Sequence, residues 1–70
     1  MILTKQEKSE IVQQHIKNLS FNKYNTDLSI IEENAAAFPN KQIIDSLESQ
    51  LSDLNSKIAA LTTELDSLES

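Results

Sequence analysis

Residues 41–69 read KQIIDSLESQLSDLNSKIAALTTELDSLE, and this stretch decides the fold. Within it, leucine and isoleucine recur at intervals that alternate between three and four residues over four heptads. This spacing is typical of a coiled coil, in which the a and d positions form one apolar seam along a helix. We therefore predict a single helix over residues 41–69. The residues of its seam are Ile44, Leu47, Leu51, Leu54, Ile58, Leu61, Leu65 and Leu68.

A second apolar stripe with the same alternation precedes this seam, over residues 21–38. Pro39 cannot continue the helix that precedes it, and Asn40 is a favourable N-cap for the helix that follows. The simplest arrangement that buries both stripes is all-α: an antiparallel helical hairpin of coiled-coil type, with its turn at Phe38-Pro39-Asn40. The residues expected to face the seam of 41–69 are Phe21, Tyr24, Leu28, Ile31 and Phe38, with Ala35 between the last two.

The charge distribution favours the antiparallel direction. Residues 1–23 carry four lysines and two glutamates, whereas residues 24–70 carry two lysines and nine acidic residues. An antiparallel hairpin brings the basic end of the first helix toward the acidic end of the second. In this arrangement we expect Ile31 to face Leu51 and Phe21 to approach Leu61.

The first helix begins with a recognisable signal. Thr4 and Glu7 have the spacing of a capping box, in which each side chain satisfies a free backbone amide at the helix start. The apolar stripe that follows is out of register with the stripe that begins at Phe21, so we expect the helix to stutter, bend or stop near Ser20. The sequence leaves open whether residues 4–37 form one helix or two, split near 20–25. The members of the earlier stripe are Ile11 or Val12, then Ile16 and Leu19.

The composition argues against an enzyme. The chain has 70 residues and forms one domain over 1–70, with no cysteine, no glycine and a single histidine. Disulfides, thiolate metal sites and glycine-rich phosphate loops therefore have no residues to build them. His15 has no recognised acid, base or nucleophile arrangement around it, and we interpret it as a structural residue. We expect no catalytic residue, no cofactor, no metal site and no small-molecule substrate.

Charge and hydropathy set the remaining expectations. The chain is acidic, with a net charge of −5, and all six basic residues are lysines. An acidic surface without arginine opposes nucleic-acid binding. No apolar run approaches the length of a membrane span, and the first residues lack the apolar segment of a signal peptide. We expect a protein of the cytoplasm, or of a virion assembled there, with no membrane association.

Part of the chain resembles a known class of proteins. The segments Asn22-Lys23-Tyr24-Asn25 and Ser29-Ile30-Ile31-Glu32-Glu33-Asn34-Ala35, followed by the leucine and isoleucine heptads, resemble the short coiled-coil proteins encoded by tailed bacteriophages, particularly those that infect cyanobacteria. The resemblance implies a virion component or a small phage accessory protein. It carries over no functional residue.

Two functions are compatible with these patterns. A hairpin of this size buries only one side of each helix, so it needs further packing to become stable. The first hypothesis is a non-enzymatic structural or assembly protein that associates with its own copies or docks on a larger scaffold. The alternative is a small regulatory adaptor that captures a helix of a host or cellular protein and gains helix on mixing with it.

Overall fold

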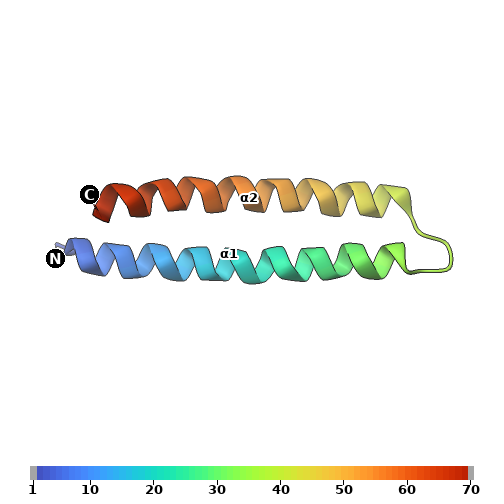
Figure 1. Cartoon of the computed structure of the whole chain (residues 1–70), viewed down its shortest axis with the longest axis horizontal. Coiled ribbons are helices and arrows are strands. Elements are labelled where there is room, and N and C mark those ends of the chain that lie inside the picture. The colour runs from blue at the N-terminus through green and yellow to red at the C-terminus, as the bar shows by residue number, and fades with distance from the viewer. Residues whose placement is uncertain (1, 70) are drawn as a thin grey trace.

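The computed structural model describes residues 2–69 and consists of two long helices. Helix α1 spans Lys5–Asn34 and helix α2 spans Lys41–Glu69. They lie side by side in opposite directions, so both ends of the chain are at one end of the molecule and the connection is at the other (Figure 1). The molecule measures 54 × 19 × 14 Å. The predicted all-α antiparallel hairpin is confirmed.

Helix α1 begins at the predicted capping box. The Glu7 amide donates to Thr4 Oγ1 at 3.1 Å, and the Thr4 amide donates to Glu7 Oε1 at 2.9 Å. The hydrogen bond from the Thr4 amide, and then that from the Thr4 side chain, lowers the pKa of Glu7 below its ordinary value. Two backbone amides that would otherwise have no partner in the first helical turn are thereby satisfied.

Helix α1 continues without a break through Ser20, which settles the question that the sequence left open. The Ser20 hydroxyl donates to the carbonyl oxygen of Ile16 at 2.8 Å, and Thr26 donates to Asn22 in the same way. In both cases the hydroxyl bonds to a carbonyl four residues earlier, a pattern that is compatible with a helix interior although it adds no stability to it. The helix ends at Asn34, three residues before the predicted end near residue 37.

The connection between the helices contains more residues than the predicted three-residue turn. Ala35 caps α1 in a right-handed conformation, and its amide donates to the Ile31 carbonyl at 3.0 Å. No residue among 2–69 has a positive φ, which agrees with a chain that contains no glycine. A tight glycine-type reversal is therefore replaced by the segment 35–40. The Asn40 amide donates to Glu33 Oε1 at 2.9 Å and so links the end of α1 to the start of α2.

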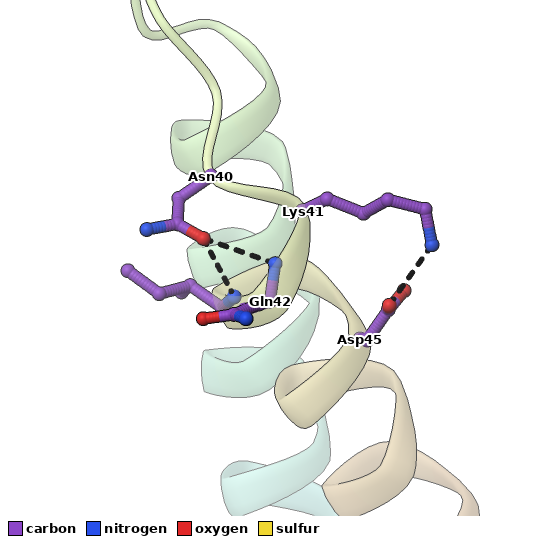
Figure 2. A network of polar contacts seen from close by, with 5 residues as sticks. Asn40, Lys41, Gln42 and Asp45 are labelled. Carbon is purple, nitrogen blue, oxygen red and sulfur yellow. Dashed lines mark hydrogen bonds and ion pairs between the residues drawn. The ribbon is translucent and has the colours of Figure 1, made fainter.

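Asn40 caps the start of helix α2, as the sequence predicted. The Asn40 side-chain oxygen accepts from the amides of Gln42 at 3.0 Å and Ile43 at 3.3 Å (Figure 2). In the same turn Lys41 Nζ lies 3.0 Å from a carboxylate oxygen of Asp45. The hydrogen bond and the charge of Asp45 raise the pKa of Lys41. Both groups are solvent-exposed, so the amide cap matters more to the helix start than the ion pair.

Candidate interaction surfaces

The face of α2 toward α1 is the predicted seam. All eight a and d residues of α2, from Ile44 to Leu68, are half-buried, and the residues between them are exposed. None of the residues described by the structure is fully buried, whether apolar or polar. The hairpin therefore contains a line of contact between two helices but no enclosed core.

The face of α1 toward α2 differs from the prediction. Most half-buried residues of α1 fall on a line whose intervals alternate between three and four from Ser9 to Glu33. Asp27 and Ser29 are also half-buried and lie beside this line. This line extends the register of Val12 through the whole helix. The stripe that contains Val12 therefore faces α2 along its length, and the stripe that begins at Phe21 does not. The members of the line after Ser9 are Val12, Ile16, Leu19, Lys23, Thr26, Ile30 and Glu33.

The stripe that begins at Phe21 lies on the other side of α1. At 100° per residue its residues are centred roughly 150° around the helix from the line that contacts α2. The prediction that this stripe contacts the α2 seam within the hairpin is therefore wrong. Leu28, a member of the stripe, is exposed. The exposed fractions of the others are 60% for Phe21, 64% for Tyr24, 62% for Ile31 and 92% for Phe38.

The physical reason is the continuity of α1. A straight helix presents one face to its neighbour along its whole length, so either the Val12 stripe or the Phe21 stripe can contact α2. The aliphatic residues Val12, Ile16 and Leu19 occupy the contact near the chain ends. Without a stutter near Ser20, the same face continues with Lys23 and Thr26 toward the connection.

Shallow grooves between the helices lie beside the seam. One groove, nearer the chain ends, is largely apolar in lining and includes His15, Leu19 and Leu61. The other, nearer the connection, is more polar and includes Asn22, Thr26 and Leu54. The apolar groove is completed by Asn18, Lys57 and Ala60, and the polar groove by Asn25, Ser29, Leu47, Gln50 and Asp53.

The comparisons with known proteins add no relative. No family model, no curated protein and no solved structure matches this chain. The resemblance to phage coiled-coil proteins therefore stays a prediction.

The described residues offer little chemistry outside packing. No group of three histidine, aspartate or glutamate side chains among them comes together as a metal site. Across residues 2–69 the ion pairs are Lys41–Asp45 and Lys57–Asp53, both within α2. The basic start of α1 and the acidic end of α2 are neighbours (Figure 1), but no ion pair joins them among residues 2–69. Neither helix is long and apolar enough to cross a membrane.

Proposed function

We propose that this chain is a non-enzymatic structural or assembly protein that acts through coiled-coil association. Its partners are copies of itself or a larger protein scaffold. The observation that carries the proposal is the incomplete core, because the eight seam residues of α2 remain partly exposed and no residue among 2–69 is buried.

The surface area supports this proposal. The molecule exposes 5338 Å², whereas a compact monomer of its mass of 7.9 kDa exposes about 4,400 Å². The radius of gyration is 16.1 Å, against about 11 Å for a compact chain of this length. A two-helix hairpin with such a large surface gains most of its stability by covering the open sides of its seam with further helices.

The proposal extends to the setting in which the assembly forms. The resemblance to phage coiled-coil proteins favours a component of a virion, or a phage accessory protein, assembled in the cytoplasm. An antibody to this chain that labelled purified phage particles would support this extension. Labelling confined to the unassembled fraction of an infected cell would contradict a place in the particle.

The experiment that tests the association is sedimentation equilibrium combined with far-UV circular dichroism on the purified chain. We expect a helical species at a fixed multiple of 7.9 kDa. A fully helical monomer that unfolds cooperatively would contradict the proposal. A poorly helical monomer would indicate that the residues that complete the core belong to another protein, as the adaptor hypothesis expects.

A pair of variants tests whether the α2 seam is responsible for folding and assembly. Leu54→Asp places a charge in the half-buried line of α2, so we expect loss of helix and of assembly. Ser56→Asp adds the same charge on the exposed side of α2 and should leave both properties unchanged. A Leu54→Asp chain that stayed helical at the parent mass would show that the seam does not hold the assembly together.

A further inference from the structure

We infer that the outer face of α1 binds a second copy of this chain in an antiparallel, two-fold symmetric contact. We call this face the outer stripe and define it as Phe21, Tyr24, Leu28 and Ile31. The inference rests on the proposed function and deepens it, because it names both the surface and the partner. The surface is separate from the α1–α2 seam, so each can be tested alone.

The outer stripe is apolar, contiguous and uncovered. Its residues are all exposed, and they include two of the three aromatic residues of the chain. They lie opposite the face of α1 that contacts α2, so α2 cannot cover them. Large apolar side chains that recur at intervals of three and four form a ridge of the kind that packs against another helix.

The spacing of the outer stripe is self-complementary. The intervals from Phe21 to Ile31 are three, four and three residues, and they read the same in both directions. Two antiparallel copies related by an axis between Tyr24 and Leu28 therefore align all four positions. Phe21 of one copy packs against Ile31 of the other, and Tyr24 packs against Leu28, so that an aromatic ring always meets an aliphatic side chain.

The charges beside the outer stripe select the antiparallel direction. Lys17 lies at one end of the stripe, where its Nζ is 6.0 Å from the centre of the Phe21 ring. In the antiparallel pair Lys17 comes within about 5 Å, along the helix axis, of Glu32 of the second copy. In a parallel pair Lys17 would lie beside Lys17 of the second copy. Asp27 would then lie beside Glu32 in the flanking positions that carry interhelical pairs.

The antiparallel pair has one unfavourable feature. Asp27 of each copy lies close to the two-fold axis, so like charges meet once there. Two attractive Lys17–Glu32 pairs outweigh this single repulsion, whereas the parallel pair contains two Asp27–Glu32 repulsions and no attraction. The contact spans about 15 Å of helix. A contact this short is weak alone and adds to the association of the seams.

The first test removes the outer stripe. The double variant Phe21→Ser, Ile31→Ser trims four side chains from the dimer contact, and we expect the dimer dissociation constant from sedimentation to rise about 100-fold. The matched control is Ile11→Ser, which trims an exposed aliphatic residue elsewhere on α1 and should leave the constant unchanged. Circular dichroism should show the same helix content in all three chains.

The second test reports the direction. The chain has no cysteine, so a single introduced cysteine is the only site for a short bismaleimide cross-linker. Asn25→Cys lies beside the two-fold axis and should cross-link to its copy. Gln14→Cys lies far from its own copy in the antiparallel pair and should not. Cross-linking of both variants would indicate a parallel pair and overturn the inference.

The outcomes separate this inference from the proposed function. A parent chain that associates as strongly as the outer-stripe variant overturns the inference and leaves association through the seam in place. A poorly helical monomeric parent overturns the inference and leaves docking on another protein. A stably helical monomer overturns both.

Discussion

The two ends of the hairpin differ in what they offer to the same α2 seam. Toward the chain ends, the α2 leucines face an aliphatic line on α1 that contains Val12, Ile16 and Leu19. Toward the connection, equivalent α2 residues face a line that contains Lys23, Thr26 and Glu33. The a and d positions of α2 are leucine or isoleucine throughout. They face apolar residues of α1 in one half of the hairpin and largely polar residues in the other.

The difference explains why a large apolar stripe is exposed. In the half near the connection, Ile30 is the one aliphatic residue on the line toward α2, whereas Phe21, Tyr24, Leu28 and Ile31 lie on the face away from α2. The half near the chain ends contributes the aliphatic part of the contact with α2, and the half near the connection leaves the outer stripe of α1 uncovered. Helix α1 thus has two apolar faces, each mainly in its own half.

The largest expected effect compares truncations in the two halves. Leu61→Ala removes a contact in the apolar half and should lower the free energy of unfolding by about 2 kcal/mol. Leu47→Ala removes a residue that faces polar side chains and should cost about 1 kcal/mol. Urea unfolding at one fixed protein concentration measures both values, because association contributes to them. Equal losses would contradict the division of the hairpin into two unequal halves.

A smaller effect is expected from repairing the polar half. Thr26→Leu places an aliphatic side chain against the α2 seam and should raise the free energy of unfolding by about 1 kcal/mol. Gln13→Leu is the control, because it adds the same side chain on an exposed part of α1. If both variants stabilised the chain equally, helix propensity and not packing would be responsible.

The smallest effect concerns the two helix starts. The pKa of Glu7 is lowered in the folded chain, so the cap contributes stability above its ordinary pKa and loses it as the pH falls through the lowered value. The Asn40 side-chain oxygen that accepts from Gln42 and Ile43 belongs to a carboxamide, which does not titrate. Acidification should therefore lower the protection of the Glu7 amide against hydrogen exchange, measured relative to the intrinsic exchange rate at each pH, before that of the Gln42 amide. Thr4→Ala should remove this dependence of the protection on pH. If the dependence persisted in the variant, the Thr4–Glu7 cap would not be its cause.

Much of the molecule could be predicted from local signals. The capping box at Thr4, the N-cap at Asn40 and the eight-residue seam of α2 each rest on contacts within a few residues or on a long unbroken period. The predicted end of α1 near residue 37 is three residues too late, because the alanines after Asn34 are good helix formers and Pro39 limits the helix only from the C-terminal side. The sequence could not predict that Lys23 and Glu33 are half-buried against α2, because charged residues at such positions argue against a packed face.

Two helices, their starting caps, the antiparallel hairpin and the seam of α2 all follow from the amino-acid sequence. Which face of α1 meets that seam follows from how the two helices pack. A helix period marks every apolar stripe with equal clarity, but a straight helix can turn only one of them toward a single neighbour. Because α1 runs unbroken through Ser20, the Val12 stripe takes that place and the Phe21 stripe remains outside.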